Sequence, residues 1–403
     1  MIRNAERGDI QALAELWARA FPGERTVAQR IAHLEMGGVY GGLETAWIAE
    51  DAGRVVGAYR AYALTQHMHG TAYRMMGLAA VAVDETARRR GVGRELCEHA
   101  VRMARDRGDV LSALYPFRPA FYRALGWGMA GELHAYRFRP ESLLPRGPLD
   151  VRRGGSGDAA GIAACYEVFA RETNGLIRRT QRVWRHHLDA NGLQAYLAGN
   201  DDIRGYVLVR FGRGGSPDDR PMYIRELVAS DHDAYRSLLG WVSAQRDAWR
   251  VAIYEAAPDE HFAHLLAEPR PPRYHGTRNL WAPVARVIRG PMLRIVDVPR
   301  ALEQRVRWGP CPPARFGLAL TDPIVPENDG PFEVDCDGTL AVVRRASRSP
   351  GIRTSADVFA QIFSSELRVK EAVALGLAEA DGDVSAMDAV FRVDRCFRLL
   401  DEF

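Results

Sequence analysis

Apolar residues recur at helical spacing directly after a short apolar stretch at the start of the chain. Asp9 stands at the boundary between the two, and we expect its carboxylate to cap the helix by accepting free N–H groups of the first turn. The pattern therefore predicts a strand, a turn and an amphipathic helix. The apolar helical face consists of Ile10, Leu13, Leu16, Trp17 and Ala20.

The same pattern returns 149 residues later. Seven positions of the first segment, beginning at residue 2, match similar residues 149 positions further on, without a gap. Ile2-Arg3 corresponds to Val151-Arg152, and Gly8-Asp9 corresponds to Gly157-Asp158. The match predicts a duplicated domain. Further along, strand signals at 55–62 and 78–83 in the first copy correspond to those at 205–211 and 223–229 in the second.

Two stretches rich in proline divide the chain at 140–148 and 269–291. We therefore expect an N-terminal domain at 1–140 and a central domain at 150–285. A third domain at 290–403 shows no echo of the other two.

A candidate phosphate site lies in the first copy, where an apolar strand leads into an arginine-rich turn, two glycines and an amphipathic helix. The start of a helix presents unpaired N–H groups and positive dipole charge, which suits a pyrophosphate. Glycines let the backbone approach the phosphates, and arginines add fixed positive charge. The residues expected to bind this group are Val81, Ala82, Val83, Arg88, Arg89, Arg90, Gly91, Val92, Gly93 and Arg94.

This motif resembles the acetyl-CoA loop of the GCN5-related N-acetyltransferases (GNAT). The second copy departs from it, because Asp231 is followed by a helical stretch at 232–238 that has no glycine and one arginine. We therefore interpret the second copy as a scaffold that lacks a phosphate cradle.

Two tandem GNAT-like units, of which only the first has the loop, followed by a third domain, resemble the Eis family of acetyltransferases over the whole chain. The resemblance implies an α+β fold with two mixed α/β GNAT-like domains and a C-terminal sterol-carrier-protein-like α/β domain. It also implies acetyl-CoA as co-substrate and a homohexamer. The acceptors that the resemblance implies are amines, including aminoglycosides acetylated at several positions, polyamine-like compounds and some protein lysines.

The resemblance also assigns the catalytic groups. Tyr122, in a Phe-Tyr-x-x-x-Gly-Trp ending, matches the general acid, and the terminal carboxylate of Phe403 matches the general base. An amine attacks only as the free base, so a proton acceptor is needed, and a tyrosine hydroxyl is a proton donor at neutral pH. We expect the backbone at Val81–Val83 to polarise the thioester carbonyl. We also expect Phe403 to lie beside Tyr122.

Other candidates have weaker signals. Phe117 and Arg118 match a CoA-contacting turn, and Glu402, with Asp401 beside it, matches a position that contacts substrate. Cys97 is interpreted as a core thiol and not as a nucleophile. Trp17, Phe21 and Tyr40 either line the amine pocket or pack in the core.

Composition changes this picture little. The net charge is +3, and Lys370 is the only lysine among 54 basic residues, so nothing favours nucleic acid as a partner. Five dispersed cysteines, among them Cys311, predict reduced thiols and no metal site. We expect no signal peptide and no membrane span, and therefore a cytoplasmic protein. Two other functions stay open, a protein-lysine acetyltransferase and a non-catalytic assembly that binds acyl-CoA or lipid.

Overall fold

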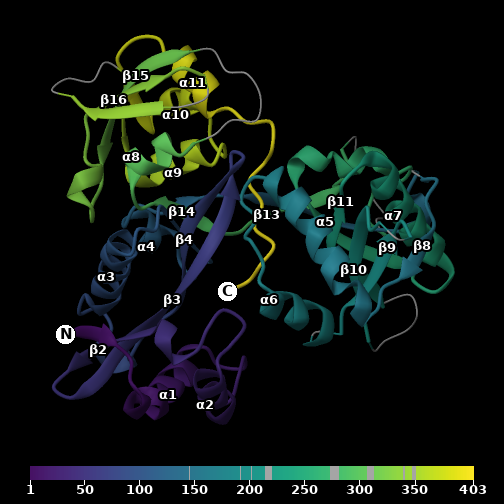
Figure 1. The fold of residues 1–403 in the computed structure, drawn as a ribbon, viewed down its shortest axis with the longest axis horizontal. Helices are drawn as coiled ribbons and strands as arrows, with labels where there is room; N and C mark the ends of the chain where they lie inside the picture. Colours follow the sequence, from purple (N-terminus) through teal and green to yellow (C-terminus); the bar gives the residue numbers. More distant parts are fainter. Residues whose placement is uncertain are drawn as a thin grey trace. The chain divides into compact units, whose positions relative to one another are not determined.

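The protein is described by a computed structural model, in which the chain forms two compact units (Figure 1). The first consists of Met1–Ala130, Gly290–Val393 and Asp401–Phe403, and the second of Gly131–Arg289 and Asp394–Leu400. The structure describes residues 1–144, 146–190, 192–200, 202–213, 220–272, 281–305, 313–338, 341–346 and 351–403. Cys311 lies outside these described residues.

A seven-stranded sheet forms the centre of the first unit, in the order β1-β2-β3-β4-β5-β14-β6. Its elements are β1 (Ile2–Asn4), β2 (Ala46–Asp51), β3 (Arg54–Met68), β4 (Thr71–Val83), β5 (Leu111–Leu114), β6 (Gly128–Met129), β14 (Met292–Ile295), α1 (Ile10–Ala20), α2 (Val27–Met36), α3 (Val92–Asp106) and α4 (Pro119–Arg123). Successive residues of a strand point to opposite faces. Accordingly, Ala58 of β3 packs in the cluster around α1, and Tyr59 packs in the cluster around α3.

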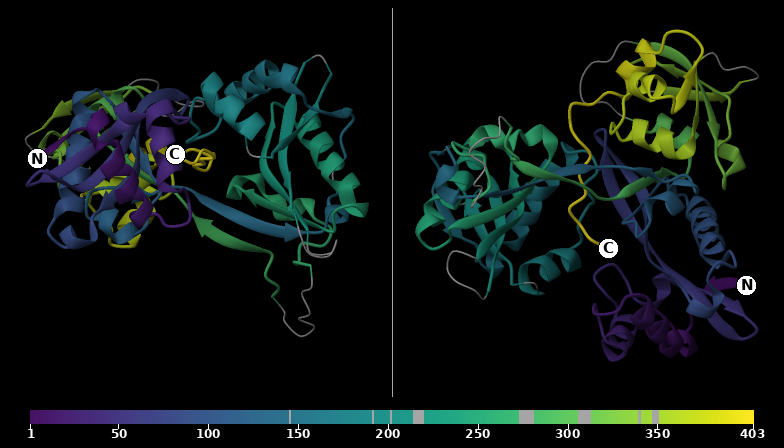
Figure 2. Two further views of the ribbon diagram at one scale, coloured as in Figure 1. Left: turned by 90° about the horizontal axis from the view of Figure 1, so that it is seen from below. Right: turned by 180° about the vertical axis from the view of Figure 1, so that it is seen from behind.

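The third segment adds a five-stranded sheet to the same unit, in the order β17-β16-β15-β18-β19. Its elements are α8 (Val298–Glu303), β15 (Ala314–Thr321), β16 (Phe332–Cys336), β17 (Ala341–Arg345), β18 (Gly351–Ser355), α9 (Ala356–Phe363), α10 (Val369–Ala374), β19 (Ala378–Ala380) and α11 (Ser385–Phe391). The β3–β4 hairpin extends from the α1–α2 end of the unit to this segment (Figure 2). There the ring of His69 bonds to the Phe363 carbonyl oxygen at 2.5 Å.

The second unit is built on another seven-stranded sheet, in the order β13-β7-β12-β11-β10-β9-β8. Its elements are β7 (Glu132–Phe138), β8 (Val151–Arg153), α5 (Ala159–Arg171), α6 (Gln181–Arg185), β9 (Gln194–Ala198), β10 (Gly205–Phe211), β11 (Pro221–Ala229), α7 (His232–Ala244), β12 (Val251–Ala256) and β13 (Ala285–Arg289). Strand β8, a 3-10 turn and α5 reproduce the order of β1, a 3-10 turn and α1 in the first unit. The predicted repeat is therefore confirmed.

The two copies share one ion pair at their start. Arg3 pairs with Asp9 at 2.7 Å, and Arg152 pairs with Asp158 at the same distance. The expected role of Asp9 as a helix cap is wrong, because no first-turn N–H of α1 bonds to its carboxylate. That carboxylate instead accepts the backbone N–H of Glu6 at 2.8 Å and holds the Arg3 guanidinium, which also lowers the pKa of Asp9.

Two strands, β7 and β14, belong to other sheets than the expected domain boundaries imply. The boundary expected at residue 140 leaves β7 in the first domain, whereas β7 pairs with β12 and β13 of the second sheet. The boundary expected at residue 290 leaves β14 in the third domain, whereas β14 pairs with β5 and β6 of the first sheet. Strand pairing depends on contacts between residues far apart in sequence, and the position of a proline-rich linker does not indicate which strands pair.

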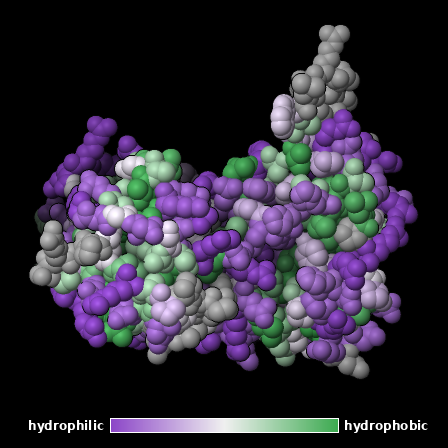
Figure 3. Space-filling model, turned by 90° about the horizontal axis from the view of Figure 1, so that it is seen from above, coloured by the Kyte–Doolittle hydropathy of each residue, from purple (hydrophilic) through white to green (hydrophobic). Residues whose placement is uncertain are grey.

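Hydrophilic residues cover much of the face shown in Figure 3, with smaller hydrophobic areas between them. None of the helices in the described ranges combines the length and the apolarity needed to cross a membrane.

Candidate active site

Strands β4 and β5 separate part of the way along β4. They pair in parallel over only three positions, from Met75 with Leu111 to Gly77 with Ala113. Strand β4 continues to Val83 and keeps its pairing with β3 on the other side. The edge of β4 beyond Gly77 therefore presents peptide groups that the described part of β5 does not pair, and such groups need water or a ligand.

A β-bulge lies on this open part of β4. Ala58 of β3 pairs with Ala82, whereas Arg60 pairs with Ala79, so Ala80 and Val81 together face one residue of β3. Ala80 has a φ of 49°, in the left-handed region that residues with a side chain seldom adopt. Bulges turn the backbone locally and are frequent next to active sites. This one lies at the start of the Val81–Val83 backbone that we expect to contact the thioester.

The arginine loop has the geometry of an anion site. Gly91 has a φ of 90°, and α3 begins directly after it. The first bond of the helix runs from the Glu95 N–H to the Gly91 carbonyl at 3.0 Å, so the N–H groups of residues 92–94 have no partner within the helix. Gly93 leaves space near the end of β4, because a Cβ there would lie 3.5 Å from Val83.

The arginines of this loop are exposed, as an incoming phosphate requires. Arg88 and Arg89 extend into solvent, while Arg90 pairs with Asp51 at 3.1 Å and Arg94 pairs with Glu98 at 2.7 Å. Exposed ion pairs of this kind contribute little energy, so these side chains can exchange a carboxylate for a phosphate. The loop therefore fits the pyrophosphate of a CoA ester.

The second copy has a carboxylate where the first has its free helix N-terminus. Asp231 precedes α7, and its Oδ1 accepts the N–H groups of Asp233 and Ala234, both at 2.9 Å. A hydrogen bond from Arg204 lowers the pKa of Asp231 and keeps it ionised. A protein anion thus occupies the position where a phosphate would bind, which explains why this copy lacks a cradle.

Tyr122 lies in α4 and is 3% exposed. Its ring packs against Phe117, Phe121 and Trp127, with centroids 5.6, 5.0 and 6.0 Å away. Burial raises the pKa of the Tyr122 hydroxyl, which keeps it protonated and able to donate. Phe117 is 71% exposed, and Arg118 beside it is exposed too, so both are accessible to a ligand at this turn.

Phe403 packs among three tyrosines of the first unit. Its ring centroid lies 6.2 Å from that of Tyr40, 6.4 Å from that of Tyr62 and 6.0 Å from that of Tyr115. Tyr115 directly follows β5. The sequence-based expectation is that Tyr122 lies beside Phe403, but the aromatic neighbours of the Phe403 ring include Tyr115 and not Tyr122. The sequence signal for Tyr115 was its place seven residues before Tyr122 in the same motif.

Asp401 fixes this terminal segment and is fully buried. Its carbonyl oxygen accepts the Tyr115 hydroxyl at 3.1 Å, and its Oδ1 accepts the Tyr40 hydroxyl at 3.3 Å. Burial, and then the charges of Asp401 and Glu402, raise the pKa of Tyr115. The contacts of Asp401 therefore hold the terminal segment in place, whereas Glu402 is exposed.

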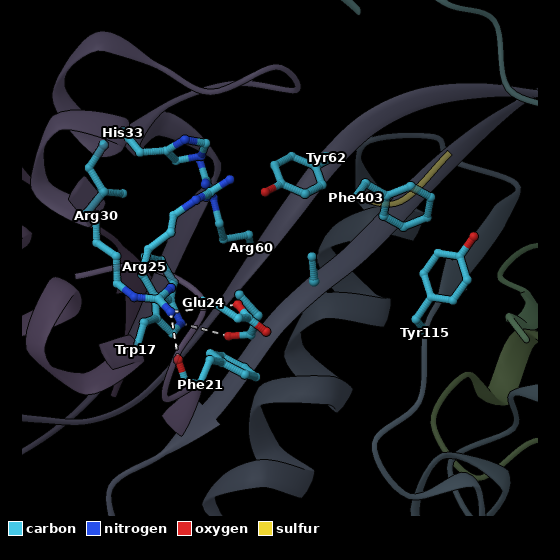
Figure 4. Close-up of a pocket in the computed structure, with 13 residues that line it drawn as sticks. Trp17, Phe21, Glu24, Arg25, Arg30, His33, Arg60, Tyr62, Tyr115 and Phe403 are labelled. Carbon is cyan, nitrogen blue, oxygen red and sulfur yellow. Dashed lines mark hydrogen bonds and ion pairs between the residues drawn. The ribbon is translucent and has the colours of Figure 1, made fainter. Parts of the chain in front are cut away.

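A cavity of about 320 Å³ lies next to Phe403 (Figure 4). Trp17 and Phe21 are in its wall and also pack in the core cluster around α1, so both expectations hold for them. Tyr40, Asp401 and Glu402 are not among the described residues that line the cavity. Sequence reasoning did not anticipate its arginines. The lining residues are Trp17, Phe21, Glu24, Arg25, Arg30, His33, Leu34, Arg60, Tyr62, Ala79, Ala80, Tyr115 and Phe403.

Burial bears on the role of Cys97, and the arrangement of His, Cys, Asp and Glu side chains bears on metal binding. Cys97 is fully buried in α3, and burial raises the pKa of its thiol to about 12, so it is a core residue. Within the described ranges, no three His, Cys, Asp or Glu side chains form a group that could hold a metal ion.

Comparison with known proteins identifies each part of this architecture. Residues 1–130 and 175–295 match models of the GNAT acetyltransferase domain, and residues 298–397 match the sterol carrier protein domain. An uncharacterized N-acetyltransferase of Streptomyces griseus is 25% identical over 414 residues, which cover 93% of this chain and 91% of that protein. N-acetyltransferase Eis of Mycobacterium tuberculosis is 28% identical over 248 residues, 57% of each chain.

Solved structures share the whole fold. A GCN5-related N-acetyltransferase from Anabaena variabilis has a TM-score of 0.83 at 21% identity, and Eis1 from Mycobacterium abscessus has a TM-score of 0.82 at 23% identity. Both alignments cover 100% of each chain.

The open strand edge, the anion loop and these matches define an N-acetyltransferase of the GNAT superfamily, and enzymes of this superfamily use acetyl-CoA. Within the superfamily the chain is Eis-like, with two GNAT domains followed by a sterol-carrier-protein domain.

Proposed function

We propose that the protein transfers the acetyl group of acetyl-CoA directly to an amine of a small molecule, with Phe403 and Tyr122 as the catalytic residues. The observation that carries the proposal is the position of Phe403, which lines a cavity together with Ala79 and Ala80. These two residues lead into the Val81–Val83 edge of β4, where the thioester would bind. A cavity of about 320 Å³ favours a small acceptor.

The base in this proposal is the terminal carboxylate of Phe403. An alkylamine is mostly protonated at neutral pH. One proton therefore has to pass from the ammonium group to the carboxylate, directly or through water, before the nitrogen can attack. The nitrogen then forms a bond to the carbonyl carbon of the thioester while the C–S bond breaks. Backbone N–H groups near Val81–Val83 would stabilise the negative charge that develops on the carbonyl oxygen.

The acid in this proposal is Tyr122. As the C–S bond breaks, sulfur takes the electron pair, and the Tyr122 hydroxyl donates its proton to give the free CoA thiol. The nitrogen, which is positively charged after the attack, loses its second proton, and this proton restores the Tyr122 hydroxyl directly or through water. The proton held by Phe403 is then released to solvent. No covalent acyl-enzyme forms, so the reaction needs no nucleophilic cysteine.

The test removes each group separately. Tyr122→Phe keeps the ring packing and removes the proton, and one residue added after Phe403 moves the terminal carboxylate. We expect each change to lower kcat about 100-fold or more, with KM for acetyl-CoA nearly unchanged. Release of the CoA thiol from acetyl-CoA, followed with a thiol reagent over a panel of amines, measures both constants.

Matched controls separate chemistry from folding. Tyr223→Phe removes a tyrosine hydroxyl from the second unit, and one residue added before Met1 extends the other terminus. Both should leave kcat unchanged, and all variants should keep the wild-type melting temperature within a few degrees. Full activity of the protein extended after Phe403 would eliminate its carboxylate as the base.

A further inference from the structure

The wall of the cavity carries more positive than negative side chains. Arg25, Arg30 and Arg60 line it, whereas Glu24 is the one acidic side chain among the lining residues that the structure describes. Glu24 lies 3.7 Å from the Arg30 guanidinium, and its single negative charge offsets only part of the positive charge of the three arginines. An aminoglycoside or a polyamine brings several positive charges, and close like charges repel. This wall does not suit the acceptors that the family resemblance implies.

Arg60 is held rigidly in the wall and is 4% exposed. Its Nε donates to the Thr45 hydroxyl at 3.0 Å, and its Nη2 donates to the carbonyl oxygens of Gly42 at 2.8 Å and Gly41 at 3.0 Å. None of these partners is charged. Burial lowers the pKa of Arg60, and Tyr62 and Glu44 offset only part of this effect.

Arg30 is also buried, at 8% exposed. Its Nη2 donates to the Phe21 carbonyl at 3.1 Å, but its Nε is buried without a hydrogen-bond partner. Burial lowers the pKa of Arg30 as well. A guanidinium that is buried and incompletely bonded is costly unless a further acceptor binds to it.

The two kinds of lining residue lie on different sides of the cavity. Figure 4 shows Arg25, Arg30 and His33 gathered on one side, and Tyr62, Phe403 and Tyr115 on the other. The arginine side belongs to α2 and the segment before it, and the aromatic side holds the proposed base. A bound molecule would therefore meet positive charge at one end and the reacting groups at the other.

We propose that the acceptor is an amine whose far end carries an anionic group such as a carboxylate, bound by Arg25 and Arg30 while the amine faces Phe403. The inference rests on the proposed acetyl transfer. Guanidinium groups bind carboxylates and phosphates through charge-assisted hydrogen bonds. Trp17, Phe21 and Tyr62 then contact an apolar or aromatic body between the two ends.

Three probes that differ only at the far end test the inference. They are 4-(aminomethyl)benzoate, 4-(aminomethyl)benzamide and 1,4-bis(aminomethyl)benzene. We expect kcat/KM to be about 10- to 100-fold higher for the acid than for the amide, and lowest for the diamine. A phosphonate in place of the carboxylate shows which anion the arginines prefer.

Variants locate the effect. Arg25 is exposed, so Arg25→Gln and Arg25→Glu should fold normally, whereas Arg30→Gln changes a buried group. Arg25→Gln should raise KM for the acid several-fold, and by a larger factor than it raises KM for the amide. Arg25→Glu should reduce or reverse the preference for the acid over the diamine. Arg7→Gln, at an exposed position outside the cavity, is the matched control.

The outcomes separate the two proposals. Equal or better acetylation of the diamine or of kanamycin overturns the anionic acceptor and leaves acetyl transfer standing. An acid preference that persists unchanged in Arg25→Glu and Arg30→Gln also overturns it. Binding of acetyl-CoA without turnover of any amine would instead contradict the proposed function itself.

Discussion

Gly77 faces the ring of Phe403 at a distance that leaves no space for a side chain. A Cβ at Gly77 would lie 2.9 Å from the Phe403 ring and 2.9 Å from a methyl group of Leu64. The last paired position of β4 with β5 is therefore also the surface on which the terminal residue rests. The absence of a side chain at this position makes room for the Phe403 ring.

Replacing this glycine should move the terminal ring. We expect Gly77→Ala to lower kcat about 10- to 100-fold, because displacing a reacting group by about 1 Å is enough for such a loss. KM for acetyl-CoA should stay within about twofold, since the arginine loop is untouched. Steady-state kinetics of thiol release measure both constants.

Gly8→Ala is the control, because a Cβ at Gly8 meets nothing within 4 Å. It should keep wild-type kinetics. Wild-type kcat in Gly77→Ala would show that the exact position of Phe403 does not matter for turnover.

At the scale of elements, the two helix starts of the repeat differ in whether their first N–H groups already have a protein partner. Helix α3 begins after Gly91 with free N–H groups, whereas α7 begins after Asp231, whose carboxylate bonds to the corresponding N–H groups. Both helices follow a strand of their sheet. The difference lies in the connection between strand and helix, which is residues 84–91 in the first copy and residues 230–231, with the Asp231 cap, in the second.

Gly91→Ala should weaken acetyl-CoA binding. The φ of 90° strains any residue with a Cβ by about 1–2 kcal/mol, while the space around it is open, the nearest atom being 3.8 Å away. Relief of that strain would turn the first N–H groups of α3 away from the phosphates. We expect KM for acetyl-CoA to rise about 5- to 20-fold with a smaller change in kcat.

Gly157→Ala is the matched control in the second copy, because a Cβ there meets no atom within 4 Å. Its KM should equal that of the wild type. An unchanged KM in Gly91→Ala would mean that this helix start does not hold the phosphates.

The elements visible in the sequence are those that local spacing specifies. The strand, turn and helix that begin each copy, and the helix that follows the arginine-rich turn, depend on residues close together in the chain, and these elements form where the spacing predicts them. The Asp9 cap was wrong because Arg3 and the Glu6 N–H compete for the same carboxylate. Such competition is decided by the turn geometry of the folded chain.

At the scale of the whole molecule, the second unit holds the segment that leads to Phe403. Arg398 is 6% exposed and forms an ion pair with Glu260, and its backbone N–H donates to the Asn174 carbonyl at 2.7 Å. The Cys396 N–H donates to an Asp259 carboxylate oxygen at 3.3 Å. A GNAT domain without a phosphate cradle thus retains a structural task.

Releasing this anchor should impair a reaction whose groups lie in the first unit. We expect Arg398→Ala to lower kcat about 10-fold and to leave KM for acetyl-CoA unchanged, because the tail loses a buried ion pair while the loop stays intact. Kinetics, together with limited proteolysis of the last residues, measure the effect.

Arg171→Ala removes an exposed ion pair with Glu167 in the same unit and serves as the control. It should behave as the wild type. Normal kcat in Arg398→Ala, with a tail that proteases cleave readily, would show that the anchor does not position Phe403.

Contacts between distant parts of the chain account for what the sequence could not reveal. The neighbours of Phe403 come from residues 40, 62 and 115, and the arginines of the cavity come from a helix, a loop and a strand. No spacing rule links these positions. The resemblance to Eis supplied the idea that the terminus is catalytic, but it also implied polycationic acceptors, which the wall of this cavity does not favour.

The place of β14 between β5 and β6 sets an order for biosynthesis. The ribosome has to release residue 295 before the first sheet can be completed, and all of Gly131–Arg289 is translated in the meantime. During that interval the edge of β5 is open to pairing with other nascent strands. A gene fragment that stops at Ala130 would encode a sheet with one vacant position, so we expect such a fragment to aggregate.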